Sequence, residues 1–445
     1  MLTRRDFEGT LRRHLIDVWF PRCLDLEHGG FLSGFDREWH VYGPQEKLLE
    51  FQARQTWVAA ELLRYFPSEA KLHQAAQHGF RFLREIMWDR QAGGWFHRVD
   101  RAGNALESST KHAHGIAYAI AACASVHAAT GELGSSELAS EGLDWLERHA
   151  HDECHGGYFG WLKQDGTPIR QPRDCPWPTQ SDTIDTPIGF KDINVHSDLF
   201  ETFLYLCRLQ SEPRVWARLN ELANLICHRI ITPSGALFYF FEADWTPAPQ
   251  LMRYGQALQT TFRLLAARDV LGRDETIVSI ARRVLDLTLR YAWDEENGGF
   301  FLAGPGASWT TLQGHDLLVR RKEWWIQFEG LRALLALNLA INDNSIYLDY
   351  FERQWKFLHR YIFDAIHGGV YLAALDGLPR WRQAVGARWA PGSLTEKGNY
   401  WKDASHEGWA LLYCASMLDA NGRPSNASRQ QYGVLEARLP LRLAS

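Results

Sequence analysis

Two stretches of the sequence place histidines among other polar side chains at the start of an otherwise apolar predicted helix. DINVHSDLFETF brings Asn194, His196 and Glu201 into the opening turns of one helix, and WKDASHEGWALL places His406 in the same way in another. An imidazole has a pKa close to neutrality and can therefore both accept and return a proton. Although a lone helical histidine is usually structural, the polar surroundings favour a functional role, and we predict that His196 and His406 are catalytic.

A third stretch, RRKEWWIQFEGLRALL, sets polar groups between tryptophans and contains Trp324, Trp325, Gln327 and Glu329. A sugar site combines flat apolar faces with amides and carboxylates that bond hydroxyl groups. Arg54, in QARQTW, begins another helix and is suited to bind a ring oxygen, an anionic intermediate or a buried carboxylate. We expect these five residues to contact a sugar, together with Asn194 and Glu201 on the helix of His196.

The remaining potential metal ligands are poorly spaced for a metal site. His112 and His114 stand two residues apart on a predicted helix and so face different directions. The seven cysteines are scattered and form no CxxC pair, which argues against both a disulfide framework and a zinc site. We predict no metal site and reduced thiols.

The composition narrows the kind of partner. A net charge of −5 over 445 residues is too small to indicate nucleic acid or a membrane surface, and 19 tryptophans suit a small sugar ligand as well as a core of large side chains. No segment reaches the roughly 18 uninterrupted apolar residues of a membrane span, and the charged start MLTRRDFEGTLRR lacks the apolar stretch of a signal peptide. These features predict a cytoplasmic protein.

A glycine motif followed by aromatic residues recurs along the chain and predicts the fold. Its copies begin at Gly29, Gly93, Gly156, Gly235, Gly298 and Gly368. Long stretches with apolar residues at helical spacing lie between the copies, so each unit is expected to hold two helices and a short hairpin entered through a tight turn. Six helix pairs close naturally into a ring, whereas an open helical superhelix is the alternative.

We therefore predict an all-α protein, an (α/α)6 barrel with short β-hairpins in the loops at one end. Residues 1–445 are expected to form a single domain. Two long loops, 163–193 and 379–402, are expected to lie over the bowl that holds the active site, because a compact fold rarely keeps long loops without a use.

The chain resembles the N-acylglucosamine 2-epimerase superfamily over nearly its whole length. The resemblance rests on an Asn-x-His-x4-Glu series (Asn194, His196, Glu201), a Trp-Trp-x-Gln-x-Glu series (Trp324, Trp325, Gln327, Glu329) and a Trp-Lys-x3-His series (Trp401, Lys402, His406).

This resemblance implies a barrel that moves the proton on C2 of an open-chain sugar through a cis-enediolate without a redox cofactor, as a monomer or a homodimer. It also implies that His406 matches one of two catalytic histidines, and that Arg54, His196, Trp325 and Glu329 match positions that shape the sugar site.

One segment departs from the pattern of the superfamily. Where relatives have Gly-His-x-x-Glu around the second catalytic histidine, this chain reads YGQALQTTF, with Gln256 and Gln259 at the matching positions. Glutamine cannot act as a general base at neutral pH. His114 also stands where relatives often have tyrosine, and we predict that Gln256 and His114 contact the substrate.

The missing histidine leaves several functions open. With His406 as a single base, a proton shuttles between C1 and C2 on one face of the sugar, which favours aldose–ketose isomerisation. If His196, His114 or His315 takes the vacant role, 2-epimerisation is preserved. A glycoside hydrolase or lyase would need two carboxylates across the bowl, such as Glu329 and Glu201. A barrel that only binds sugar is the remaining alternative.

Overall fold

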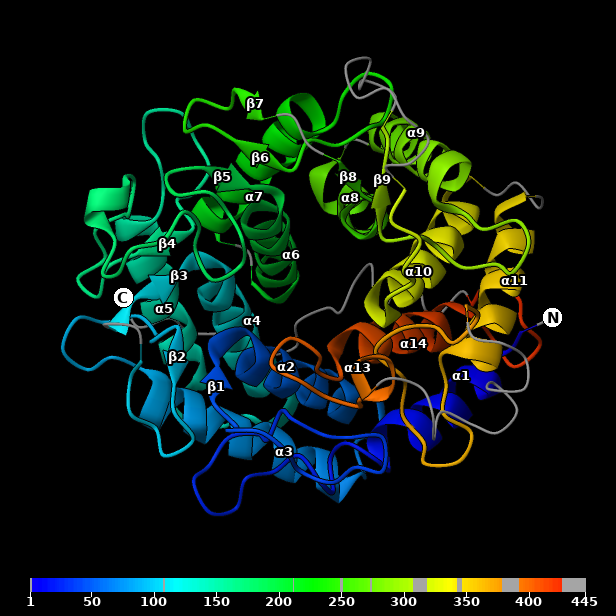
Figure 1. The fold of residues 1–445 in the computed structure, drawn as a ribbon, viewed down its shortest axis with the longest axis horizontal. Coiled ribbons are helices and arrows are strands. Elements are labelled where there is room, and N and C mark those ends of the chain that lie inside the picture. The colour runs from blue at the N-terminus through cyan, green and yellow to red at the C-terminus, as the bar shows by residue number, and fades with distance from the viewer. Residues whose placement is uncertain are drawn as a thin grey trace.

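The helices form a closed ring of inner and outer layers (Figure 1). The computed structural model describes residues 2–106, 109–210, 212–248, 251–272, 274–306, 318–341, 346–377 and 392–425. The inner layer of this part consists of α2 (Leu49–Tyr65), α4 (Ala113–Thr130), α6 (Ile193–Leu209), α8 (Tyr254–Leu271), α10 (Trp324–Ile341) and α14 (Ser405–Met417). The outer layer consists of α1 (Arg4–Leu11), α3 (Ala70–Phe82), α5 (Ser135–His149), α7 (Pro213–Leu225), α9 (Asp274–Ala292) and α11 (Ile346–Tyr361).

The two layers differ in sequence because they differ in what covers them. Inner helix α4 is buried on nearly every side and is built from alanine and other small or apolar residues, which let it pack against neighbours all round. Outer helix α5 buries one stripe that includes Leu138, Leu143 and Trp145, and presents its charged side chains to solvent. The inner helix is thus apolar on nearly all sides, and the outer helix is half polar.

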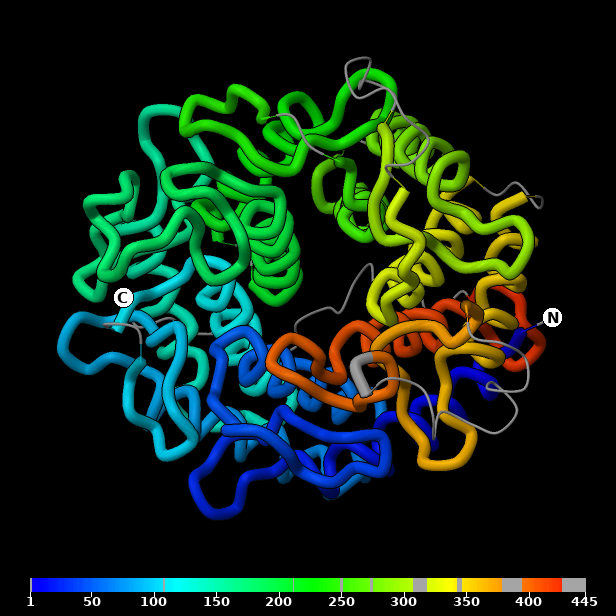
Figure 2. The backbone as a smooth tube through the Cα atoms, viewed as in Figure 1, coloured from blue at the N-terminus to red at the C-terminus, as the bar shows by residue number. Residues whose placement is uncertain are grey.

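The ring closes where the two ends of the described chain meet. Helix α1 packs against α14, α14 contacts both α10 and α2, and the backbone N–H of Arg4 donates to the carbonyl of Asp419 at 3.2 Å. The blue N-terminal and red C-terminal segments run side by side in Figure 2. Closure confirms the (α/α)6 barrel and excludes the open superhelix.

Short strands collect at the end of the barrel where the inner helices begin. β1 (Lys47–Leu48) pairs antiparallel with β2 (Arg98–Val99), and β3 (Lys111–His112) pairs with β4 (Trp161–Leu162). β5 (Lys191–Asp192), β6 (Phe240–Phe241) and β7 (Pro247–Ala248) form one small sheet, and β8 (Met252–Arg253) pairs with β9 (Ala303–Gly304). Each strand that enters an inner helix is thus tied to the hairpin of the following unit, as the hairpin prediction required.

Five of the six hairpins carry a glycine pair in a backbone conformation that other residues rarely tolerate, and the sixth has Gly235 alone. Gly156 and Gly157 have φ angles of 73° and 74°, and a Cβ on Gly157 would lie 2.6 Å from His196 Nε2. The pair is therefore required both by its left-handed conformation and by the close approach of α6.

Buried lysines fix the hairpins that precede α2, α4, α6 and α10 to those helices. Lys191, two residues before α6, donates from Nζ to Asp152 Oδ2 and to the carbonyl of Gly156, both at 2.7 Å. Lys47, Lys111 and Lys322 stand in the same place before α2, α4 and α10 and make the same two kinds of contact. The repeated motif therefore serves as scaffold.

The two predicted loops differ in how far the structure places them. Loop 163–193 reaches the start of α4, because Asp182 Oδ2 lies 3.1 Å from His112 Nε2. Most of loop 379–402 lies outside the described residues, but its last part approaches the barrel interior, where the carbonyl of Trp401 accepts from Arg54 Nη2 at 3.4 Å. The seven cysteines are all free, and no described helix has the length and hydropathy that a membrane crossing requires.

Candidate active site

The mouth of the barrel is lined by side chains that share one face of each inner helix. On α6, Asn194, Asp198 and Glu201 follow one another at intervals of four and three residues, so they point the same way. On α10 the same spacing places Trp325, Glu329 and Arg332 on the inward face. Predicted site residues that do not lie on the inward face of their helix make other contacts.

His196 is one of these, and its contacts are of a structural kind, although the sequence predicts a catalytic role. Its Nε2 accepts the backbone N–H of Tyr158 at 2.9 Å, and its Nδ1 lies 2.6 Å from the carbonyl of Asp192. The side chain is completely buried, and burial lowers its pKa to about 3. With both nitrogens occupied by backbone groups, His196 holds the hairpin of Gly156 and Gly157 instead of meeting a substrate.

Gln327 makes structural contacts of the same kind, although the sequence predicts it as a sugar ligand. Its amide accepts from the backbone N–H of Phe300 and donates to the carbonyl of the same residue, each at 2.8 Å. Gln52 grips Phe31 in this way on α2. Gln52, His196 and Gln327 each occupy the fourth position of an inner helix, so this position clamps the preceding glycine hairpin.

His406 lies on the inward face and is oriented by a buried carboxylate. Its Nδ1 is 2.7 Å from Glu329 Oε1, while Arg332 Nε donates to the other oxygen at 2.5 Å. Burial raises the pKa of Glu329, but Arg332 and His406 outweigh it and hold the pKa at about 2. Because an ionised carboxylate can only accept, Nδ1 carries the proton and Nε2 is left as the basic nitrogen of neutral His406.

Aromatic rings surround this imidazole. The ring of Trp325 lies 5.7 Å from that of His406, and the ring of Trp324 lies 6.2 Å away in an edge-on arrangement. Gln259 Nε2 donates to Glu329 Oε1 at 3.4 Å, so the second glutamine of the departing segment also reaches the pair. The resemblance predicted Trp325, Glu329 and His406 at one site, and the structure brings them together.

His114 is held between two carboxylates and carries a positive charge. Its Nδ1 lies 3.2 Å from Glu50 Oε1, and its Nε2 lies 2.5 Å from Asp198 Oδ2. Burial lowers the pKa of His114, but Asp198 and Glu50 outweigh it and raise the pKa to about 9. An imidazolium whose two N–H groups are both bonded cannot serve as a base at neutral pH.

Arg54 links α2 to the segment that precedes His406. Its Nε forms an ion pair with Asp403 Oδ2 at 2.8 Å, and its guanidinium lies 5.2 Å from the ring centre of Tyr118. The sequence left three roles open for Arg54, and its contacts show one of them, the ion pair with a buried carboxylate. Its charge nevertheless remains at the mouth, where the side chain is 6% exposed.

Asn194 and Gln256 form a polar pair across α6 and α8. Gln256 Nε2 donates to Asn194 Oδ1 at 3.1 Å, and Asn194 Nδ2 donates to the hydroxyl oxygen of Tyr239 at 2.5 Å. The side-chain oxygen of Gln256 has no hydrogen-bond partner among the described residues. The pair therefore offers an acceptor for a sugar hydroxyl.

Glu201 lies deeper than the mouth and ties two arginines together. It accepts from Arg263 Nε at 2.9 Å, and its other oxygen lies 3.7 Å from Arg332 Nη1. Arg263 also pairs with Asp198 at 2.6 Å. A chain of charges thus runs from His114 to His406. Sequence reasoning missed three of its members, Asp198, Arg263 and Arg332, and the spacing of Asp198 from Asn194 was the available signal.

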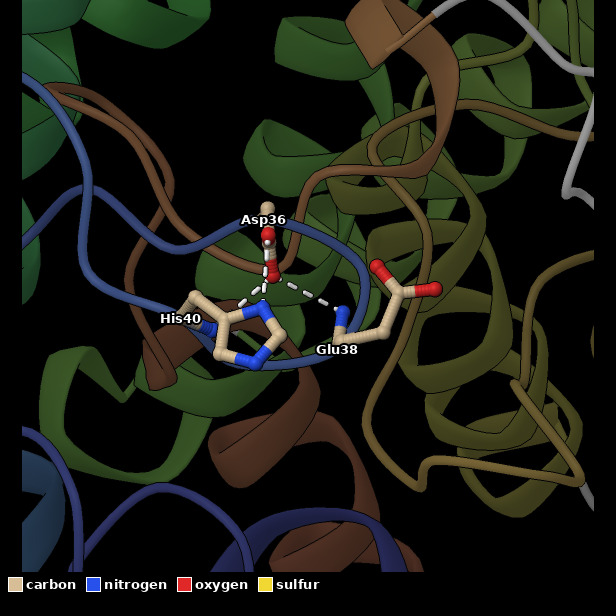
Figure 3. A group of neighbouring side chains, drawn as sticks. All are labelled: Asp36, Glu38 and His40. Carbon is tan, nitrogen blue, oxygen red and sulfur yellow. Dashed lines mark hydrogen bonds and ion pairs between the residues drawn. The ribbon is translucent and has the colours of Figure 1, made fainter.

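One surface group has ligand atoms close enough to suggest a cation. Among the described residues, Asp36, Glu38 and His40 bring three potential ligands together (Figure 3). The Asp36 carboxylate already accepts from the backbone N–H groups of Glu38 and His40 and lies 3.0 Å from His40 Nδ1. These contacts explain the cluster as a stabilised surface turn.

Comparison with known proteins gives a consistent picture. A family model described as N-acylglucosamine 2-epimerase matches residues 29–133 and 178–380. The chain is 22% identical over 408 residues to a cellobiose 2-epimerase of Bacteroides fragilis, and the aligned region covers 92% of this chain and 97% of that protein. It is 26% identical over 369 residues to a D-mannose isomerase of Marinomonas mediterranea, which covers 79% of this chain and 85% of that protein.

Solved structures agree with this assignment. The cellobiose 2-epimerase of Spirochaeta thermophila superimposes with a TM-score of 0.77 at 26% identity and covers 92% of this chain and 94% of its own. The family model spans more than half of the sequence, and the barrel and the mouth residues that carry the resemblance are in place. The chain belongs to the N-acylglucosamine 2-epimerase family.

Proposed function

We propose that this protein interconverts an aldose and its ketose by moving one proton between C2 and C1 of the open-chain sugar through a cis-enediolate. The observation that carries the proposal is the state of the histidines at the barrel mouth. His196 is bonded through both nitrogens to the backbone, and His114 is bonded through both to carboxylates. His406, in contrast, is bonded through Nδ1 and offers Nε2.

His406 is suited to act as a single base. Neutral Nε2 takes the proton from C2 and returns it to C1 on the same face of the intermediate. The hydroxyl proton of O2 passes to O1 of the enediolate, so that O2 becomes the carbonyl oxygen of the ketose. As the imidazolium forms, ionised Glu329 stabilises it from the Nδ1 side. Charged Arg54 and His114 contribute positive potential at the mouth that favours the negative enediolate.

The glutamine at position 256 favours isomerisation over 2-epimerisation. Inversion at C2 needs proton transfer on both faces, and Gln256 supplies only an amide where the resembling family has its second histidine. The relatives named as cellobiose 2-epimerases make epimerisation the second candidate. It would require a base from outside the residues described at the mouth.

Glycoside hydrolysis is less well supported because its acid catalyst must be protonated near neutrality. The pKa of Glu329 is held at about 2, and Glu201 is bound by Arg263 and Arg332. Neither carboxylate is therefore placed as a proton donor.

Proton NMR of the product in deuterated buffer tests the proposal. The protein is incubated with mannose, glucose, fructose, N-acetylmannosamine, cellobiose and mannobiose, beside a heat-denatured sample. A ketose or aldose product with solvent deuterium at C1 or C2 is expected. A 2-epimer as the main product would show that the protein is an epimerase and contradict the proposal. Release of a new reducing end would identify a hydrolase.

A further inference from the structure

A cavity lies at the opposite end of the barrel interior from His406. Its volume is about 420 Å³, and its wall includes Tyr65 and Leu209, the last residues of α2 and α6, and Leu339 in the last turn of α10. The inner helices begin at the mouth, so these residues lie at the far end. Arg54, His114, Gln256 and His406 do not line this cavity.

The walls suit an apolar body. Leu204, Phe262, Leu265, Ala336 and Leu412 line the cavity. An apolar cavity of about 150 Å³ is sufficient for benzene, and small-molecule sites start at about 300 Å³. The cavity is therefore large enough for a compact organic molecule, and its leucines and phenylalanine are poor partners for the hydroxyl groups of a sugar.

Three buried donors on residues of the wall have no acceptor among the described residues. They are Arg332 Nη2, Trp57 Nε1 and Trp409 Nε1. The side chains that carry them belong to residues only 2%, 4% and 8% exposed. Buried donors without a partner are rare in folded proteins. All three are N–H groups, so a molecule that satisfied them would have to supply acceptors.

The charges of the wall favour an anion. Five arginines line the cavity against the three acidic residues Glu61, Glu201 and Asp269. Arg332 is the arginine that combines full burial with an unbonded nitrogen, since its Nε is engaged by Glu329 while Nη2 has no partner. A guanidinium in this state is a preferred partner for a carboxylate or phosphate.

We propose that the far-end cavity binds a small acidic molecule with an apolar body, whose anionic group is accepted by Arg332 and whose body packs against the leucine and tryptophan side chains of the wall. The cavity shares Arg332 and Glu201 with the chain of charges that reaches His406, but Arg54, Gln256 and His406 do not line it, and the proposal does not depend on the reaction proposed for the mouth. Octanoate serves as the probe, since it combines a carboxylate with a flexible chain of suitable size.

Isothermal titration of the full-length protein with octanoate, alongside tryptophan fluorescence from Trp57 and Trp409, tests this site. Ala336→Phe fills the cavity without touching an ion pair, and Ala340→Phe is its matched control on the same helix outside the wall. Arg332→Gln removes the anion partner, and 1-octanol is the uncharged counterpart of the probe. Circular dichroism confirms that each variant is folded.

One octanoate per chain is expected, with at least tenfold weaker binding to Ala336→Phe and unchanged binding to Ala340→Phe. The affinity for 1-octanol should be at least tenfold lower than for octanoate, and a folded Arg332→Gln should reduce this preference. Absence of saturable octanoate binding, equal binding of the alcohol, or full binding by Ala336→Phe would each overturn the proposal.

Discussion

Replacing Glu329 by glutamine isolates what the carboxylate does for His406. The glutamine keeps the size of the side chain and can still accept from Nδ1, but it removes the negative charge 2.7 Å from the imidazole. Both oxygens of Glu329 are already engaged by protein groups. Glu329 therefore positions His406 and stabilises its positive charge, and does not contact the sugar.

The size of the effect follows from the loss of a charged partner. A hydrogen bond to an ionised group contributes about 1.5–3 kcal/mol. If this contribution is expressed in the transition state, where His406 becomes positive, kcat should fall by about 10- to 150-fold, since about 1.4 kcal/mol corresponds to a factor of ten. KM should change little.

Initial rates of deuterium incorporation across a range of pH provide the assay. Glu407→Gln is the matched control, because Glu407 is a buried carboxylate on α14 that faces Lys402 at 4.0 Å instead of His406. A folded Glu329→Gln with the kcat of the wild type would refute this role of Glu329, as would an equal loss of kcat in Glu407→Gln.

Three further predictions follow from the contacts. The pKa of His114 is raised to about 9 in the folded protein from an ordinary 6.5, so its contribution to stability should be complete below about pH 6.5 and lost as pH rises toward 9. Urea denaturation should show this decline in the wild type and a flatter dependence in His114→Phe. Gln256→His should yield 2-epimer in addition to ketose in product NMR, whereas Gln256→Asn should not. Lys191→Met leaves Asp152 buried without its cation and should lower the free energy of unfolding by about 3–5 kcal/mol, against little change for the exposed Lys356→Met.

The fold could be predicted from the sequence because the signal was repeated. The glycine motif marks each hairpin, and the composition of each following helix separates inner from outer layers. The lysine that locks the hairpin was not anticipated, since a lysine beside a short strand gives no indication that its ammonium is buried against an aspartate and a glycine carbonyl.

The candidate site was predicted in part, and the contacts of His196 and Gln327 differ from those expected for one physical reason. Polar type and closeness to a helix start were taken as signs of function for His196 and Gln327, but both point toward a hairpin, where backbone groups need partners. The helical phase distinguishes them from Asp198 and Glu329, which face inward. Arg332 was missed because its contacts with Glu329 and Glu201 depend on which helices adjoin in the ring.

The central claim is that His406 moves the proton while His196 supports the fold. It is tested most directly by comparing solvent-deuterium exchange into a sugar substrate for the wild type, His406→Ala and a folded His196→Gln, which retains an amide able to accept from Tyr158. The account predicts that exchange disappears in His406→Ala and persists in His196→Gln, with lower thermal stability in the latter. Persistent exchange in His406→Ala would contradict it.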